Sequence, residues 1–168
     1  MDYAQYLENL ENKLRSSFDL YRDHKINNLE LDLYGRFYMT TERYLLTKKA
    51  KIFGIENNEH ILVNKIDNLD ASKLSEFIGC IIDSIDHIVD PHPEHMSSIV
   101  TGVLVIDDSI KILSDEIVDD VIKFKFHKGF SFGLRGWVDV RLLIVSLKDG
   151  IVISNKKGKE VEQVYKIS

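Results

Sequence analysis

The chain has little cysteine and little proline. Cys80 is the only cysteine among 168 residues, and the only prolines are Pro91 and Pro93. A single cysteine excludes an internal disulfide and a zinc site built from several cysteines, and it is typical of a reducing compartment. No Pro/Gly/Ser-rich linker divides the sequence, so we expect one domain over residues 1–168. The alternative is a sub-boundary near residues 91–97, where both prolines stand.

Long apolar runs are also missing. The N-terminus, MDYAQYLENLENKL, is polar and lacks the basic start and apolar stretch of a signal peptide. No apolar run approaches the ~20 residues that a membrane-spanning helix needs. We therefore expect a cytoplasmic protein without a membrane segment. The net charge of -5 and the pI of about 5.7 argue against a general nucleic-acid coating protein, which is usually basic throughout.

No complete catalytic motif is present. Gly158-Lys159 is followed by Glu160, so the chain has no phosphate-binding P-loop, and neither G-x-G-x-x-G after a strand nor G-x-S-x-G occurs. Cys80 and His87 stand two helical turns apart, ~10 Å along the axis, which is too far for a nucleophile–base pair. We expect a protein without catalysis of its own, and no cofactor is implied.

Hydrophobic periodicity predicts the secondary structure. Apolar residues at helical spacing predict helices at residues 3–21, 70–90 and 114–122. Alternation with a period of two, or a short β-branched run, predicts strands at residues 29–39, 43–53, 59–66, 97–107, 123–131, 137–147 and 151–154. The first three strands are expected to form an antiparallel meander. The order α-βββ-α-β-α-βββ predicts an α+β fold with a mixed, mostly antiparallel sheet and helices packed on the sheet.

The most informative stretch is KFKFHKGFSFGLRGW, residues 123–137. It holds four of the eight Phe, the only Trp and three of the nine Gly, with four Lys or Arg and no acidic residue. Rings, cations and bare backbone together favour a contact surface. The candidate ligand-binding residues are His127, Lys128, Phe130, Phe132, Arg135 and Trp137. The alternative is ordinary strand patterning, in which the Phe face is buried and the Lys face is solvated.

These features favour a non-catalytic binding or regulatory module for an anionic partner. The aromatic rings would stack on the partner, and Lys128 and Arg135 would pair with its charge. The partners considered are a nucleotide, single-stranded nucleic acid and an acidic protein segment.

Two alternatives stay open. A metal-dependent hydrolase or nuclease would bind a divalent metal through the Asp/His cluster of residues 83–95, because imidazole and carboxylate are normal ligands. Its candidate ligands are Asp83, His87, Asp90, His92 and His95. Their spacing matches no zinc signature, and a solvated helix end with His87 near the C-terminal dipole explains that residue equally well. The other alternative is a structural, self-associating protein, a homo-oligomer that uses the Phe-rich strand as core or interface.

Overall fold

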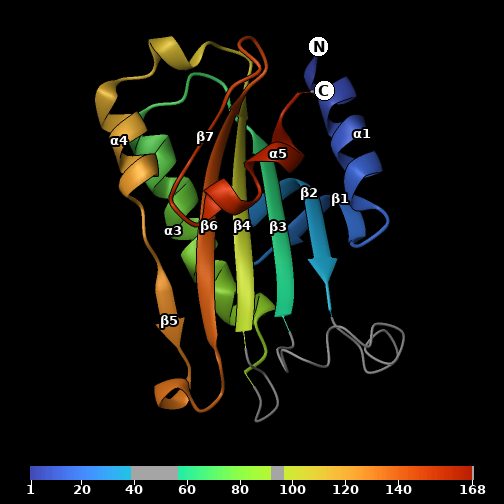
Figure 1. The fold of residues 1–168 in the computed structure, drawn as a ribbon, viewed down its shortest axis with the longest axis vertical. Helices are drawn as coiled ribbons and strands as arrows, with labels where there is room; N and C mark the ends of the chain where they lie inside the picture. Colours follow the sequence, from blue (N-terminus) through green and yellow to red (C-terminus); the bar gives the residue numbers. More distant parts are fainter. Residues whose placement is uncertain (39–56, 92–96, 168) are drawn as a thin grey trace.

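The computed structural model describes residues 1–38, 57–91 and 97–167, which build a curved mixed sheet with helices on both faces (Figure 1). Seven strands lie in the order β1-β2-β3-β4-β6-β5, and β7 also pairs with β6. The β3–β4 and β4–β6 pairs are parallel, and the other pairs are antiparallel. The predicted α+β class, with a mixed and mostly antiparallel sheet, is confirmed.

The described residues form the following strands and helices. The strands are β1 Asp19–Ile26, β2 Leu29–Phe37, β3 Asn57–Lys65, β4 Ser97–Ile106, β5 His127–Gly129, β6 Trp137–Ser146 and β7 Val152–Ser154. The helices are α1 Tyr3–Leu14, α3 Ala71–Ile88, α4 Asp115–Lys123 and α5 Glu162–Tyr165, with 3-10 turns η2 Ile110–Ile112, η3 Ser131–Gly133 and η4 Gly158–Glu160. None of these described helices is long and apolar enough to cross a membrane.

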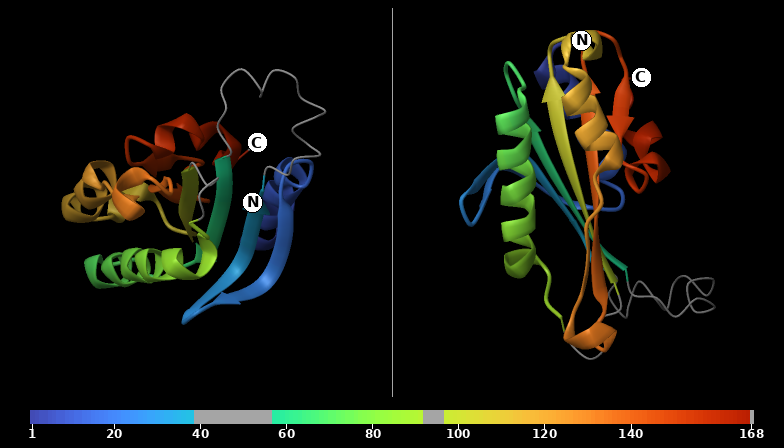
Figure 2. Two further views of the ribbon diagram at one scale, coloured as in Figure 1. Left: turned by 90° about the horizontal axis from the view of Figure 1, so that it is seen from below. Right: turned by 90° about the vertical axis from the view of Figure 1, so that its left-hand side faces the viewer.

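Helices lie on both faces of the sheet (Figure 2), and an apolar layer lies between the helices and the sheet on each face. Even-numbered residues of β4 and β6, such as Val100 and Leu142, pack with α3 and α4, while odd-numbered ones, such as Val103 and Leu143, pack with α1 and α5. This division follows from the alternation of side chains along a strand. Gly102 on β4 lets α3 approach closely, because a Cβ there would overlap Ile81 Cδ1.

The first predicted helix is too long. It ends at Leu14, and residues 19–26 form the edge strand β1, which pairs with β2. The side chains of β1 are mostly exposed, so they carry no alternation of apolar and polar residues for the sequence to reveal. Phe18 continues the helical spacing of α1, yet it packs on the layer beneath α1 from the connection to β1. The antiparallel meander is therefore β1-β2-β3, and the strand predicted at 43–53 lies outside the described residues.

The strand predicted at 123–131 is also shorter than expected. α4 continues to Lys123, whose ammonium group pairs with Asp119 one turn earlier, and only His127–Gly129 pair with β6. Phe124 and Phe126 are partly buried against the layer that α3 and α4 cover. The strands before and after residues 91–97 lie in the same sheet, where β3 and β4 are direct neighbours.

Candidate functional site

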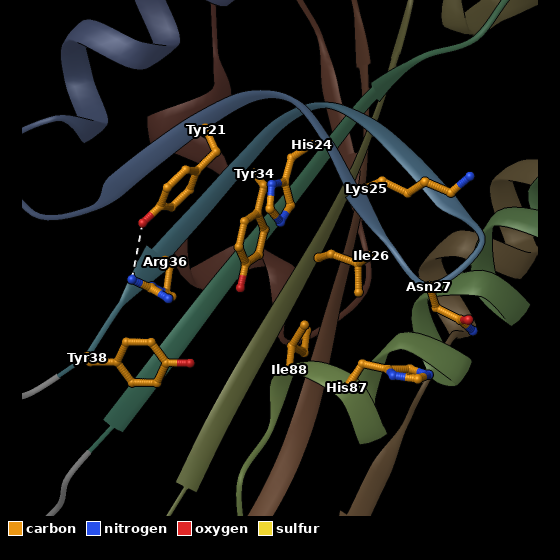
Figure 3. Close-up of a pocket in the computed structure, with 10 residues that line it drawn as sticks. All are labelled: Tyr21, His24, Lys25, Ile26, Asn27, Tyr34, Arg36, Tyr38, His87 and Ile88. Atoms are coloured by element: carbon orange, nitrogen blue, oxygen red, sulfur yellow. Dashed lines mark hydrogen bonds between the residues drawn. The ribbon is translucent and has the colours of Figure 1, made fainter.

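A hollow of about 430 Å³ lies between the β1–β2 hairpin and the C-terminal end of α3 (Figure 3). We call it the tyrosine–histidine pocket. Ten residues of the described chain line it: Tyr21, His24, Lys25, Ile26, Asn27, Tyr34, Arg36, Tyr38, His87 and Ile88. A volume of this size lies within the range of small-molecule sites, about 300–1,000 Å³.

Backbone geometry explains how these side chains meet. Tyr34 and Arg36 alternate along β2, with Tyr38 directly after its end, so all three project from the face on which α3 lies. Asp23 on β1 has a left-handed backbone (φ 49°), and the ladder with β2 is interrupted there. This distortion lets His24 line the same pocket as Tyr21, although an undistorted strand would place residues three apart on opposite faces.

An aromatic stack forms one wall of the pocket. The His24 and Tyr34 rings lie 4.8 Å apart at an interplanar angle of 11°, and the Tyr21 and Tyr34 rings lie 6.0 Å apart at 28°. The Tyr34 ring also stacks on His60 at 6.1 Å, and the Tyr38 ring meets His60 edge-on at 5.7 Å. Tyr21 and Tyr38 are each more than one third exposed, so the wall is open to a ligand.

The Arg36 guanidinium lies between two of these rings. Its Cζ stands 5.6 Å from the centre of Tyr21 and 5.1 Å from that of Tyr38, and its Nη2 donates a hydrogen bond to Tyr21 Oη at 3.1 Å. Asp19 is its ion-pair partner, at a long 3.9 Å. None of the ten described lining residues is Asp or Glu, whereas Arg36 and Lys25 are cationic. The pocket is thus positive within an acidic chain.

Two buried nitrogen atoms at this site have no hydrogen-bond partner among the described residues. They are Arg36 Nε and His60 Nε2. His60 is fully buried, and its Nδ1 lies 2.8 Å from Tyr34 Oη, so either neutral tautomer leaves Nε2 unpaired. Leaving such a group unpaired costs about 1–3 kcal/mol. Natural structures keep few such atoms, and the concentration of two of them here marks the pocket as unusual.

Burial controls the protonation of two rings in this wall, His60 and Tyr34. It lowers the pKa of His60 to about 4, with the Arg36 charge as a second cause, so this imidazole is neutral near pH 7. Burial also raises the pKa of Tyr34, so the phenol keeps its proton. The Tyr34 and His60 rings are therefore uncharged near pH 7 and lie beside the cationic Arg36. This arrangement can stack a planar ring and pair with an anion.

The six residues predicted for ligand binding lie along β5, η3 and the start of β6. His127 is exposed, with Nδ1 at 2.8 Å from Asp139 Oδ1, and the Lys128 ammonium group pairs with Asp86 at 2.8 Å. Phe132 is fully exposed, on a left-handed backbone (φ 56°), and Arg135 is also exposed. Phe130 and Trp137 are half-buried. The ring-bearing loop thus faces solvent in part, and its role in ligand binding stays a prediction.

The structure describes three of the five residues predicted for a metal site. Asp83 and His87 are exposed on α3, and Asp90 follows it, while His92 and His95 lie outside the described residues. Within residues 1–38, 57–91 and 97–167, no group of three or more His, Cys, Asp or Glu side chains is placed to hold a metal ion. His87 also lines the tyrosine–histidine pocket.

Sequence reasoning missed the tyrosine–histidine pocket. The available signal was the alternation Tyr34-x-Arg36-x-Tyr38 on a strand, which places two rings and a cation on one face. The contributions of Tyr21, from the edge strand, and of the buried His60 depend on strand pairing and carried no local signal.

The chain was also compared with known proteins. Neither the curated proteins nor the solved structures contain a match to it. One family model does match, and it covers residues 2–167. The chain therefore belongs to the family described as a domain of unknown function (DUF8052).

Proposed function

We propose that the protein is a ligand-binding module and that its ligand is an anion carrying a planar ring, such as a nucleotide. The observation that carries the proposal is the Arg36 guanidinium, which lies between Tyr21 and Tyr38 in a pocket whose described lining contains no carboxylate. A partly exposed cation that lies between two rings, with its counter-ion at a long 3.9 Å, can pair with an anionic group.

Stacking would supply the first part of the affinity. Tyr21 and Tyr38 expose more than a third of their surface, so a planar ring can lie against either of them without first displacing a core side chain. Contacts between a base and an aromatic side chain contribute about 1–3 kcal/mol each.

Charge pairing would supply the second part. The Arg36 side chain is 39% exposed, so a phosphate or carboxylate oxygen can reach its terminal amino groups. A guanidinium can hold such a group through two parallel N–H donors, which fixes orientation as well as charge.

Among the anionic partners considered, a nucleotide fits best. The pocket offers about 430 Å³, enough for one ring system and its anionic group. Single-stranded nucleic acid would need a groove that tracks its backbone over several nucleotides. A cytoplasmic location, which the single cysteine favours, would also give the protein access to nucleotides.

Calorimetric titration of the full chain tests the proposal. The four common nucleoside monophosphates are the ligands, and adenosine and inorganic phosphate are the ring-only and charge-only controls. At least one nucleotide is expected to bind about 10-fold or more tightly than either control, because only the nucleotide makes both contacts.

The variant Arg36→Gln is expected to weaken nucleotide binding by about 10-fold or more. The matched control is Arg22→Gln, since Arg22 pairs with Glu11 of α1 and does not line the pocket. Absence of binding by all four nucleotides, or equal affinity in the wild type and Arg36→Gln, would overturn the proposal.

A further inference from the structure

A second recess lies at the opposite edge of the sheet, where β5 and β7 both pair with β6 but at different places. β5 pairs with residues 137–139 of β6, and β7 pairs with residues 143–145. The backbone between them belongs to neither pair. This interruption leaves room beside β6 for a groove, which we call the edge groove.

Beneath the edge groove, the Asn155 side chain makes hydrogen bonds to backbone groups near the part of β6 that lies between the β5 and β7 pairings. Its Oδ1 accepts hydrogen bonds from the Leu142 and Gly158 amides, and its Nδ2 donates to the Val140 and Phe124 carbonyls, at 2.9–3.3 Å. Asn155 is 1% exposed. With all four bonds made, it fixes the position at which the chain leaves β7 and so the start of the following Lys156–Lys157 pair.

The edge groove has a volume of about 450 Å³ and combines an apolar floor with a cationic rim. It is lined by Phe124, Lys125, Phe126, His127, Asp139, Val140, Asn155, Lys156, Lys157 and Glu160. Val140 is buried and the two Phe side chains are partly buried against the core. Lys125 and Lys156 are exposed, and neither forms an ion pair with another described residue.

The two carboxylates of the edge groove are already engaged. Asp139 is 15% exposed in its side chain and holds two groups at once, His127 Nδ1 at 2.8 Å and Lys157 Nζ at 3.6 Å. Because Nδ1 faces Asp139, the other ring nitrogen of His127 is directed away from this carboxylate. Glu160 pairs with the buried Arg141 at 2.9 Å. Asp139 thus pairs with Lys157 and His127, which leaves Lys125 and Lys156 without a carboxylate partner among the described residues.

We propose that the edge groove binds a phosphate monoester with an apolar or aromatic body. The phosphate would lie at the Lys125, Lys156 and Lys157 ammonium groups beside His127, and the body would cover Phe124 and Phe126. A doubly charged phosphate suits this rim, because several ammonium groups can each donate to one of its oxygens. This site is separate from the proposed nucleotide site, since the tyrosine–histidine pocket lies on β1 and β2 at the other edge.

Phenyl phosphate is the probe, titrated into ¹⁵N-labelled full-length protein and followed by NMR. Saturable shifts are expected at the amides of Phe126, His127 and Lys157. Inorganic phosphate is expected to bind about 10-fold more weakly, because it lacks the ring that covers the floor. Equal affinity for the two probes, or shifts confined to the tyrosine–histidine pocket, would overturn the proposal.

Two variants complete the test. The double variant Lys156→Gln/Lys157→Gln is expected to weaken phenyl phosphate binding about 10-fold or more, and the exposed Lys148→Gln is the matched control. Unchanged affinity in the double variant contradicts the proposal. Arg36→Gln should leave the shifts at the edge groove unchanged. The two proposals can therefore be tested separately, because this variant affects only the proposed nucleotide site.

Discussion

The buried imidazole of His60 makes a quantitative prediction about stability and pH. Its pKa is lowered from 6.5 to about 4 by burial and by the Arg36 charge. Between these values the unfolded chain binds a proton that the folded chain does not, so the free energy of unfolding falls as the pH falls. Each pKa unit corresponds to about 1.4 kcal/mol, and the full shift therefore corresponds to about 3 kcal/mol.

The assay is urea unfolding of the wild type and of His60→Gln at about pH 7.5 and about pH 4. Other groups titrate over this range, but they are common to both proteins. The wild type is therefore expected to lose about 3 kcal/mol more than the variant. Tyr34→Phe serves as the control, because it removes the hydrogen bond to Nδ1 but leaves the imidazole buried. It should lower stability by about 1 kcal/mol and keep the steep pH dependence. An equal loss of stability in the wild type and His60→Gln would mean that the pKa of His60 is not lowered in the folded protein.

Two further substitutions test the packing and the edge of the sheet. Gly102→Ala is expected to destabilise the protein by about 1–3 kcal/mol, because the new Cβ would overlap Ile81 of α3. Thermal unfolding measures this loss. An unchanged melting temperature would contradict the close approach of α3 to β4. Asn155→Ala is expected to cost about 3 kcal/mol or more in urea unfolding, since it removes the partner of buried groups such as the Leu142 amide; a loss below about 1 kcal/mol would mean that other groups replace it.

The sequence was sufficient for elements whose own residues determine them. The isoleucine stripe of α3 and the β-branched run of β4 lie within a residue or two of their predicted bounds. Edge elements were harder, because β1 is mostly exposed and β5 has only three paired residues, so partner strands define them.

The candidate sites also differ in how far the sequence alone reveals them. Composition alone drew attention to residues 123–137, since their rings and cations are contiguous in the chain. The tyrosine–histidine pocket brings together Tyr21, Arg36 and His87, which are distant in sequence and meet only through strand pairing and the position of α3. The burial of His60, and with it the lowered pKa, follows from tertiary packing that no local pattern encodes.

Equilibrium dialysis can show whether the protein selects ring-bearing anions through Arg36. Wild-type protein and Arg36→Gln would be dialysed against one mixture of nucleotides, ring-bearing carboxylates and their uncharged counterparts, and the retained compounds would be measured by mass spectrometry. We expect the wild type to enrich ring-bearing anions and Arg36→Gln to lose this enrichment. The same profile from both proteins, or enrichment of the uncharged compounds alone, would contradict this expectation.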